Sequence, residues 1–330
     1  IKVRVGITIG DVNGIGPEVI IKTFSDSRMH QVCTPVIYGS SKVISFYRKT
    51  MNNMEFNFTS IKNILELNHK RTNLINCWDE EIKIEPGIAN STGGKYAFTS
   101  LQAAVKDLTD GNIDVLVTAP IDKKTMQQDG FRFPGHTEYL AQQFNTPDHL
   151  MMLVSDRLRV ATVTGHVPVK QVSQELTKEK ILSRIKIMNN SIKRDFGIRK
   201  PRIAVLGLNP HSGDNGLIGT EETEIIAPAI KAAFDSGILV YGPFPADGFF
   251  GMTKFKSFDG VLAMYHDQGL VPFKSISFDA GVNYTAGLPV VRTSPDHGTG
   301  YDIAGKGIAS EDSFRSAIYA ACDIFRNRIA

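Results

Sequence analysis

Hydrophobic residues fall in short, often β-branched runs that alternate with longer segments of helical periodicity. Several of the short runs are apolar at nearly every position, a pattern typical of strands that are buried on both faces of a sheet. The runs that predict strands are 2–9, 34–39, 113–119, 149–155, 159–164, 202–208 and 260–265.

The segments between these runs predict amphipathic helices. Pro17 suits the first position of one helix, Gly111 closes another, and Ser310 is a plausible cap for the last. Two further patterns, "KEKILSRIKIMNNSIKRDFG" and "EETEIIAPAIKAAFDSG", each end at a glycine. Strand–helix alternation of this kind predicts an α/β fold with a mostly parallel sheet.

Three histidines lie just beyond the ends of predicted strands: His166, His211 and His266. In parallel α/β sheets ligands gather at the carboxyl ends of strands. Three imidazoles meeting there would suit a catalytic zinc ion, which often keeps one position open for water or substrate. The three are distant in sequence and form no local motif, so ordinary strand-end histidines remain the alternative. Asp267 follows His266 and would orient it, act as a base, or cap the turn before Gly269.

Two groups of residues suggest an anionic ligand. "FPGHTEYLAQQF" places His136 and Thr137 at the start of an amphipathic helix, where free N–H groups and the helix dipole favour phosphate. The alternative is that Thr137 simply caps the helix. Lys274, Asn283 and Arg292 add two cations and an amide that would suit phosphate or carboxylate, with surface salt bridges as the alternative.

Two glycine-rich stretches are candidates for cofactor or turn functions. "GITIGDVNGIGPEV" is neither G-x-G-x-x-G nor a Walker loop, and tight-turn geometry alone would explain it. "GLPVVRTSPDHGTGYDIAGKGIA", residues 287–309, precedes the last helix and carries Asp296, Asp302 and Lys306. Such a loop can bring backbone close to a dinucleotide, and a flexible surface loop is the alternative.

Composition limits the class of protein. A chain of 330 residues predicts about two domains, and a net charge of +3 without a run of Lys or Arg argues against nucleic acid or an anionic membrane as partner. The three cysteines, Cys33, Cys77 and Cys322, form neither a disulfide framework nor a metal motif. No apolar run reaches the length of about 18 residues that a membrane span needs. We therefore expect a soluble cytoplasmic protein.

Long sequence blocks occur in order from the first strand to the last helix. They are "VTAPIDKKTMQQDGFRFPGHTEYLA", "TGHVPV", "LGLNPHSGDNGLIGTEE", "GPFPADGFF", "MYHDQGLVPFK" and "GVNYTAGLPVVRTSPDHGTGYDIAGKG". Together they resemble the 4-hydroxythreonine-4-phosphate dehydrogenase family of the pyridoxal phosphate pathway. The first turn departs from the family pattern at Ile9, Val12 and Asn13, where that pattern has Pro, Pro and Ala.

The resemblance implies an isocitrate/isopropylmalate-dehydrogenase-like fold with two α/β domains and a cleft between them. We expect the first domain at 1–125 plus 290–330 and the second at 126–289. The resemblance also implies a homodimer with a shared active site, to which both chains supply metal ligands. The family's metal histidines fall on His166, His211 and His266, with Zn²⁺ expected and Mg²⁺ or Co²⁺ as alternatives.

The resemblance further assigns residues to substrate, cofactor and proton transfer. The substrate-binding positions fall on His136, Thr137, Lys274, Asn283 and Arg292. The "DIAGKG" region is similar to the adenosine-side cofactor loop of isopropylmalate dehydrogenases and implies NAD or NADP bound at Asp296, Gly298, Asp302, Gly305 and Lys306. Asp247 and Asp267 are the candidates for proton transfer or for orienting the histidines.

The implied activity is a metal-dependent, NAD(P)-linked oxidation of 4-phosphohydroxy-L-threonine at C3. Its product, 2-amino-3-oxo-4-(phosphooxy)butanoate, decarboxylates to 3-amino-2-oxopropyl phosphate on the route to pyridoxal 5'-phosphate. A 4-phospho-D-threonate or 4-phospho-D-erythronate 3-dehydrogenase of the same family is the alternative. A metal-dependent hydrolase or a phosphate-acyl transferase is a rival of another class, which the "DIAGKG" loop argues against.

Overall fold

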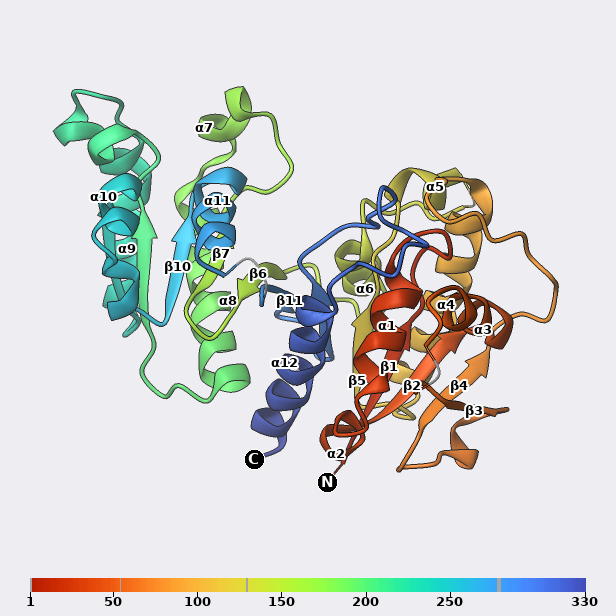
Figure 1. Cartoon of the computed structure of the whole chain (residues 1–330). Helices are drawn as coiled ribbons and strands as arrows, with labels where there is room; N and C mark the ends of the chain where they lie inside the picture. Colours follow the sequence, from red (N-terminus) through yellow and green to blue (C-terminus); the bar gives the residue numbers. More distant parts are fainter. Residues whose placement is uncertain (1, 54, 129, 278–279) are drawn as a thin grey trace. The chain divides into compact units, whose positions relative to one another are not determined.

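The computed structural model describes residues 2–53, 55–128, 130–277 and 280–330. The chain divides into two compact units, which are described separately below. Unit 1 comprises Ile1–Phe144 and Pro289–Ile329, and unit 2 comprises Asn145–Leu288. Figure 1 shows strands alternating with helices along the chain, so the predicted α/β class is confirmed.

Unit 1 is built on parallel strands in the order β3-β4-β2-β1-β5-β12. Both β1 and β2 are almost completely buried, because helices cover the two faces of the sheet. The strands are β1 Val3–Thr8, β2 Cys33–Gly39, β3 Phe58–Ile61, β4 Thr72–Asn76, β5 Val115–Thr118 and β12 Val291–Pro295.

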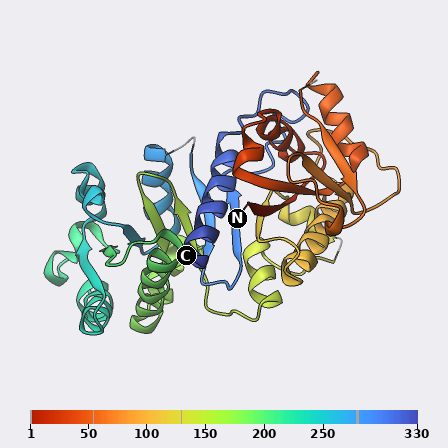
Figure 2. The same ribbon diagram turned by 90° about the horizontal axis from the view of Figure 1, so that it is seen from below.

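The helices of unit 1 lie in two layers. One face of the sheet carries α1, α3 and α12, and the other carries α4 with α5 packed beside it (Figures 1 and 2). The helices are α1 Gly16–Ser25, α2 Met29–Val32, α3 Ser41–Thr50, η1 Ile64–Glu66, α4 Ser91–Thr109, α5 Lys123–Gln128, α6 His136–Gln143 and α12 Asp312–Ile329.

Residues 126–144, which the expected boundary assigned to the second domain, belong to unit 1. The reason is an aromatic cluster. Phe131 and Tyr139 contact Phe98 of α4, with ring centroids 5.2 and 6.0 Å from it. This packing fixes α6 against the first unit.

Unit 2 has the strand order β11-β6-β7-β10-β8-β9. The strands from β7 to β9 run parallel, whereas β6 is antiparallel to both of its neighbours. The strands are β6 Leu150–Val154, β7 Arg159–Thr162, β8 Arg202–Leu206, β9 Leu239–Phe244, β10 Gly260–Ala263 and β11 Val282–Ala286.

In unit 2, α8 and α9 cover one face of the sheet, and α10 and α11 cover the other (Figure 2). The ends of α8 follow its sequence: the Thr177 side chain accepts a hydrogen bond from the N–H of Lys180, and Gly197 ends the helix at φ 69°. The helices are η2 Val169–Gln171, α7 Val172–Glu175, α8 Lys178–Phe196, η3 Pro210–Gly216, η4 Glu222–Ile226, α9 Ala227–Asp235, α10 Ala246–Gly251, η5 Lys254–Ser257 and α11 His266–Ser277.

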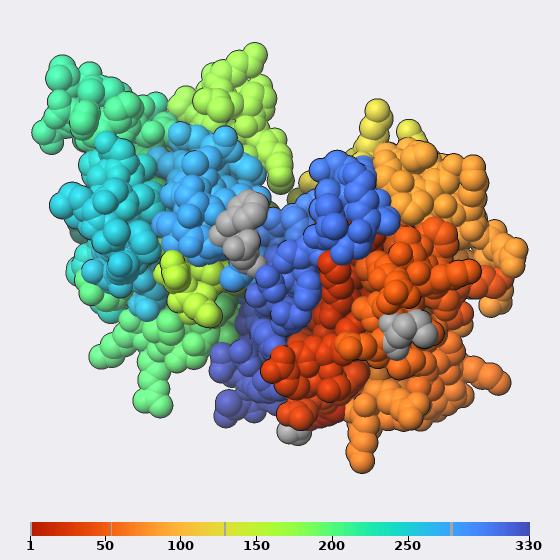
Figure 3. All heavy atoms as spheres, viewed as in Figure 1, coloured from red at the N-terminus to blue at the C-terminus, as the bar shows by residue number. Residues whose placement is uncertain are grey.

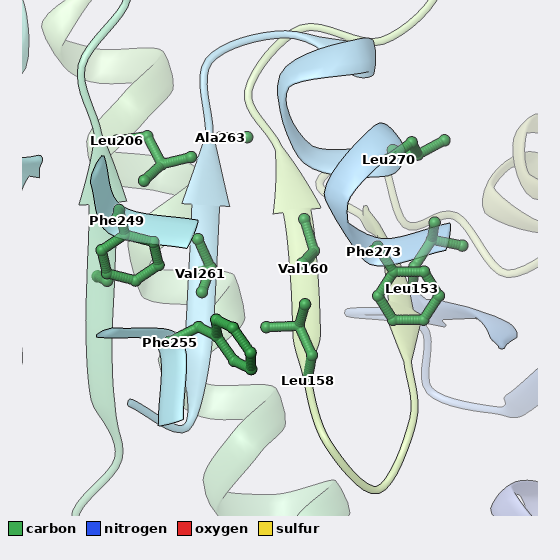
Figure 4. Packing of buried hydrophobic residues seen from close by; sticks show 11 residues of the cluster. Leu153, Leu158, Val160, Leu206, Phe249, Phe255, Val261, Ala263, Leu270 and Phe273 are labelled. Atoms are coloured by element: carbon green, nitrogen blue, oxygen red, sulfur yellow. The ribbon is translucent and has the colours of Figure 1, made fainter. Parts of the chain in front are cut away.

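A hydrophobic cluster joins the sheet of unit 2 to α10 and α11. Figure 4 shows Val160 and Val261 of neighbouring strands facing Phe249 and Phe273. This packing fixes the start of α11, and therefore His266, over the strand ends. The cluster comprises Leu153, Leu158, Val160, Ala204, Leu206, Phe249, Phe255, Val261, Ala263, Leu270 and Phe273.

The strands predicted from apolar runs are all present, with ends that differ by one or two residues. Arg292 was expected in a loop, but it lies in β12. The helix expected from Glu221 onward begins as a π-helical turn in which the N–H of Ala227 bonds the carbonyl of Glu222, and Pro228 follows it without an N–H.

No helix among the described residues combines the length and apolar character needed to cross a membrane.

Phe273 and Val271 offer a matched test of the cluster, because both lie on α11. Phe273 is 0% exposed and Val271 is 59% exposed. Phe273→Ala should lower the free energy of unfolding by about 3–5 kcal/mol, because it removes a buried ring and leaves a cavity. Val271→Ala should change it by less than about 0.5 kcal/mol. Urea unfolding followed by circular dichroism measures both, and equal losses would show that the cluster does not stabilise unit 2.

Candidate active site

A buried guanidinium lies in the sheet of unit 1. Arg292, on β12, is 4% exposed and donates two hydrogen bonds to Oγ1 of Thr118, from Nε at 3.1 Å and from Nη2 at 2.7 Å. Thr118 is the last residue of the neighbouring strand β5. Burial lowers the pKa of Arg292 to about 10, and the charge of Glu138 opposes this shift. Arg292 therefore remains a cation at neutral pH.

His136 begins α6 and is 9% exposed. Burial lowers its pKa well below the ordinary value, and the charges of Arg292 and Lys123 lower it further. Its Nε2 atom is buried and has no hydrogen-bond partner among the described residues. A neutral imidazole with its proton on Nε2 can donate a hydrogen bond to an anion.

The first turn of α6 carries two of the predicted substrate residues, His136 and Thr137. Gly135 is the N-cap residue and no side chain caps the helix, so Thr137 does not have the capping role considered above. A Cβ atom placed on Gly135 would lie 3.3 Å from Oε2 of Glu138 and 3.7 Å from Nζ of Lys123. The helix dipole and the nearby cations, Arg292 and Lys123, favour a phosphate at this end of α6.

The strand ends of unit 2 are joined by polar contacts. Thr164, beyond β7, donates from Oγ1 to the carbonyl of Met264, beyond β10, at 2.7 Å. Gln268 accepts from the N–H of Met264 at 2.7 Å and donates to the carbonyl of Gly207, beyond β8, at 2.6 Å. Since β10 lies between β7 and β8, these contacts place the three histidine-bearing loops at one edge of the sheet.

Two of the three predicted metal histidines lie close together. The ring centroids of His166 and His266 are 5.7 Å apart. Nδ1 of His266 lies 2.7 Å from Oδ1 of Asp267, which supports an orienting role for this carboxylate. His166 and Asp267 are exposed and His266 is partly exposed, so the pair is accessible from solvent.

His211 lies in a turn with unusual backbone. Residues 211–215 all have positive φ, with 54° at His211 itself. A left-handed conformation costs a non-glycine residue about 1–2 kcal/mol, so surrounding contacts must hold this turn. Glu222, 3% exposed, holds the segment directly before the turn: its carboxylate accepts from the N–H groups of Leu208 and Asn209 at 2.7 and 2.6 Å, and from Nδ2 of Asn209 at 2.9 Å.

The three predicted metal ligands, His166, His211 and His266, do not form a complete metal site within the described residues of one chain. Two imidazoles that share a tetrahedral Zn²⁺ have centroids roughly 5 Å apart, given Zn–N distances of about 2.0–2.1 Å, and the 5.7 Å between the centroids of His166 and His266 is close to this separation. Among the described residues, however, no three His, Cys, Asp or Glu side chains are grouped closely enough to hold a metal. The three-histidine site therefore stays a prediction.

The other predicted substrate residues lie in unit 2. Lys274 is on α11 and partly exposed. Asn283 is on β11, and its Oδ1 atom is buried without a hydrogen-bond partner among the described residues. Asp247 is exposed in the first turn of α10.

The predicted cofactor loop lies in unit 1 between β12 and α12. Asp302 and Lys306 are exposed, and Nζ of Lys306 donates to the carbonyl of Asp302 at 2.7 Å. The N–H of Asp296 donates to Oγ of Ser313 at 3.0 Å, and the N–H of Gly305 donates to Oε1 of Glu18 at 2.6 Å. A Cβ atom placed on Gly298 would meet nothing within 4 Å, so a ligand can approach the backbone there.

Sequence reasoning missed Thr118, Glu222 and Gln268, which position the predicted residues. Thr118 ends an apolar run, and Gln268 follows His266 and Asp267. Their positions in the sequence could therefore have indicated that they lie near the site. Glu222 belongs to "GTEE", and its burial depends on contacts with residues more than ten positions away. A pattern of neighbouring residues does not reveal such contacts.

Comparisons with known proteins identify the family of this chain. The family model described as "Pyridoxal phosphate biosynthetic protein PdxA" matches residues 31–321. The chain belongs to the PdxA family. The resemblance stated from the sequence blocks is thereby confirmed.

Several PdxA relatives align along nearly the whole chain. The 4-hydroxythreonine-4-phosphate dehydrogenase of Bacteroides thetaiotaomicron is 54% identical over 328 residues, which cover 99% of this chain and 90% of the relative. An Oceanobacillus iheyensis relative named D-threonate 4-phosphate dehydrogenase is 40% identical over 327 residues and covers 98% of each chain.

A solved structure extends the comparison to the fold. The crystal structure of 4-hydroxythreonine-4-phosphate dehydrogenase from Klebsiella pneumoniae is 35% identical, covers 98% of each chain and has a TM-score of 0.86. The relatives are dehydrogenases, and this PdxA protein is accordingly an oxidoreductase that acts on a CH–OH group.

The lowered pKa of His136 predicts a pH-dependent stability. The unfolded chain takes up a proton near pH 6.5 and the folded chain does not, so the free energy of unfolding should fall as pH decreases below this value. The fall should approach about 1.4 kcal/mol per pH unit between the two pKa values. His136→Gln should remove this component, while His69→Gln, at an exposed position, should keep it.

Urea unfolding between about pH 7 and about pH 5 measures the difference. Wild-type protein and the His69→Gln variant should lose stability more steeply with acid than His136→Gln. Parallel curves for all three proteins would contradict the neutral, buried state of His136.

Proposed function

We propose that this PdxA protein oxidises 4-phosphohydroxy-L-threonine at C3 with NAD⁺ or NADP⁺ in a metal-dependent reaction. The product, 2-amino-3-oxo-4-(phosphooxy)butanoate, would decarboxylate to 3-amino-2-oxopropyl phosphate, an intermediate of pyridoxal 5'-phosphate biosynthesis. The observation that carries the proposal is the buried Arg292–His136 group at the start of α6. The names of relatives that align along the whole chain support the substrate.

The Arg292–His136 group would bind the substrate phosphate. Arg292 supplies a fixed cation, His136 supplies a neutral donor, and the first turn of α6 supplies N–H groups near Thr137. Lys274 and Asn283 would bind the polar groups at the other end of the substrate. Fixing both ends aligns C3 for hydride transfer, and such positioning can lower a barrier by several kcal/mol.

His166, His211 and His266 would hold the metal, with both chains of a homodimer supplying ligands. A divalent ion bound there acts as a Lewis acid that lowers the pKa of the substrate hydroxyl and favours loss of its proton. Zn²⁺ suits three imidazoles, and Mg²⁺ or Co²⁺ are the alternatives. Asp267 would orient His266, and either Asp267 or Asp247 would accept the proton.

The loop with Asp296, Gly298, Asp302, Gly305 and Lys306 would bind the dinucleotide. NAD(P)⁺, when bound, accepts the hydride that leaves C3. The dimeric state and the cytoplasmic location are part of this proposal. They rest on the family resemblance and, for the location, on the absence of a disulfide pattern among the cysteines.

A second substrate deserves a direct comparison because one relative is named D-threonate 4-phosphate dehydrogenase. In 4-phospho-D-threonate and 4-phospho-D-erythronate a hydroxyl replaces the amine, while the phosphate and carboxylate remain. The same anion-binding residues would accept these substrates.

Steady-state reduction of NAD⁺ or NADP⁺, followed by absorbance, tests the proposal. We expect 4-phosphohydroxy-L-threonine to be oxidised with a kcat/KM at least about tenfold above that of 4-phospho-D-threonate, and a chelator to stop turnover. A higher kcat/KM for 4-phospho-D-threonate would show that this sugar acid is the preferred substrate. Turnover that survives complete metal removal would refute the metal-dependent mechanism.

The His211→Ala variant tests the third metal ligand. It should abolish metal-dependent turnover and reduce Zn²⁺ binding in calorimetry, because an open three-ligand site loses one of its ligands. The dimer should remain folded. His69→Ala is the control, because His69 lies outside both groups and bonds Thr34. Unchanged zinc affinity in His211→Ala would exclude this residue as a ligand.

A further inference from the structure

The glycine-rich turn at residues 10–16 is a tightly bonded part of unit 1. Its Asp11 and Asn13 side chains are 0% exposed. The N–H of Asp11 donates to the carbonyl of Pro120 at 3.0 Å, and the N–H of Asn13 donates to Oδ1 of Asp11 at 2.8 Å. The N–H of Gly14 donates to the carbonyl of Asp11 at 3.0 Å. These N–H groups are already used, so they are not available to a phosphate.

The glycines of this turn are required by close packing. A Cβ atom on Gly10 would lie 2.5 Å from the carbonyl oxygen of Pro120, and one on Gly16 would lie 2.6 Å from that of Ile9. A Cβ atom on Gly14 would lie 2.8 Å from the carbonyl oxygen of Thr299, in the loop that precedes α12. The turn therefore packs directly against the loop proposed to bind the dinucleotide.

Three hydrogen bonds join the turn and α1 to this loop. Tyr301 donates from its hydroxyl to Oδ2 of Asp11 at 2.6 Å. The N–H of Gly305 donates to Oε1 of Glu18, which is 0% exposed, at 2.6 Å. The N–H of Ile15 donates to the carbonyl of Thr299 at 2.8 Å. Two buried carboxylates thus hold the loop at both ends of its glycine-rich part.

A third segment, residues 85–90, contacts both the turn and the loop. The Asn13 side chain accepts from the N–H of Glu85 at 2.8 Å and donates to the carbonyl of Ile88 at 3.0 Å and to Oδ1 of Asn90 at 2.9 Å. A Cβ atom on Gly87 would lie 2.8 Å from the carbonyl oxygen of Tyr301. Asn13 stands where the family pattern usually has alanine, so this chain adds side-chain contacts between the turn and residues 85–90.

We propose that Asp11 and Glu18 are positioning residues that hold the 298–307 loop in its dinucleotide-binding conformation. Together with Asn13 and Tyr301 they form what we term the loop clamp. The proposal rests on the proposed function, because it assigns the dinucleotide as the ligand of that loop. In Figure 3 the loop lies on the surface of unit 1 as a blue region beside red and orange N-terminal segments.

The loop clamp should reduce the conformational entropy that the 298–307 loop loses when a ligand binds. A glycine-rich loop without anchors would lose much conformational entropy when a ligand binds. The clamp removes most of that loss before binding, and so it should strengthen dinucleotide affinity without contacting the cofactor. Phosphate-end substrate binding, which depends on Arg292 and His136, should be unaffected.

Four variants test the clamp. Tyr301→Phe removes the hydroxyl that bonds Asp11, and Glu18→Leu removes the acceptor for Gly305. Glu18→Gln keeps an acceptor oxygen and should behave like wild-type protein. Tyr38→Phe is the matched control, because Tyr38 donates to Oδ2 of Asp107 at 2.6 Å, the same kind of bond at the same distance, outside the clamp.

The first measurement needs no cofactor. Lys306 is exposed within the loop, so the rate at which trypsin cleaves after Lys306, followed by mass spectrometry, reports how firmly the loop is held. Cleavage should be about fivefold faster in Tyr301→Phe and Glu18→Leu, which each lose one buried hydrogen bond, and unchanged in Glu18→Gln and Tyr38→Phe. Equal rates in all five proteins would overturn the clamp.

The second measurement separates the clamp from the proposed function. The KM for the dinucleotide should rise about fivefold in Tyr301→Phe and Glu18→Leu, while kcat and the KM for 4-phosphohydroxy-L-threonine stay near wild-type values. Faster cleavage with an unchanged dinucleotide KM would overturn the role of the clamp in cofactor binding. If wild-type protein binds no dinucleotide in calorimetry, the proposed function fails, and the cleavage rates still decide whether the clamp exists.

Discussion

The burial of one positive charge inside unit 1 is the constraint on which the candidate active site depends. Removing a guanidinium from water costs several kcal/mol, and the fold must compensate this cost locally. Here the end of β5 supplies Thr118 Oγ1 as an acceptor for Arg292, and α6 brings the charge of Glu138 near it. The same helix start places His136 near the cation. Sheet order and helix placement therefore create a position where a dianionic phosphate would be strongly favoured.

In unit 2, polar contacts hold the loops that carry His166, His211 and His266. The ends of β7, β10 and β8 are joined through Thr164, Met264 and Gln268, and Glu222 stabilises a turn of left-handed residues around His211. The hydrophobic cluster beneath α11 fixes the start of that helix. A metal site requires such contacts, because residues that bond to the metal ligands set the orientation of those ligands.

The sequence predicted the features that depend on local pattern. Buried parallel strands are apolar throughout, so β1, β2, β5 and β10 were recognisable, and the three histidines followed from the strand ends. Strand β12 was missed because its run contains a charged residue, Arg292, at a buried position. Helix α11 was missed because Gly269 and Pro272 interrupt its pattern. The buried roles of Asp11, Glu18 and Glu222 depend on partners far away in the chain, and only the folded structure brings these together.

The most direct test of this account compares 4-phosphohydroxy-L-threonine with 4-hydroxy-L-threonine, which differs only by lacking the phosphate, in the same dinucleotide-reduction assay. If the buried cation in β12 and the start of α6 recognise the phosphate, kcat/KM should fall by at least about a thousandfold when the phosphate is removed, because remote binding energy supports catalysis. Comparable values for the two compounds would contradict the account and would require another role for Arg292 and His136.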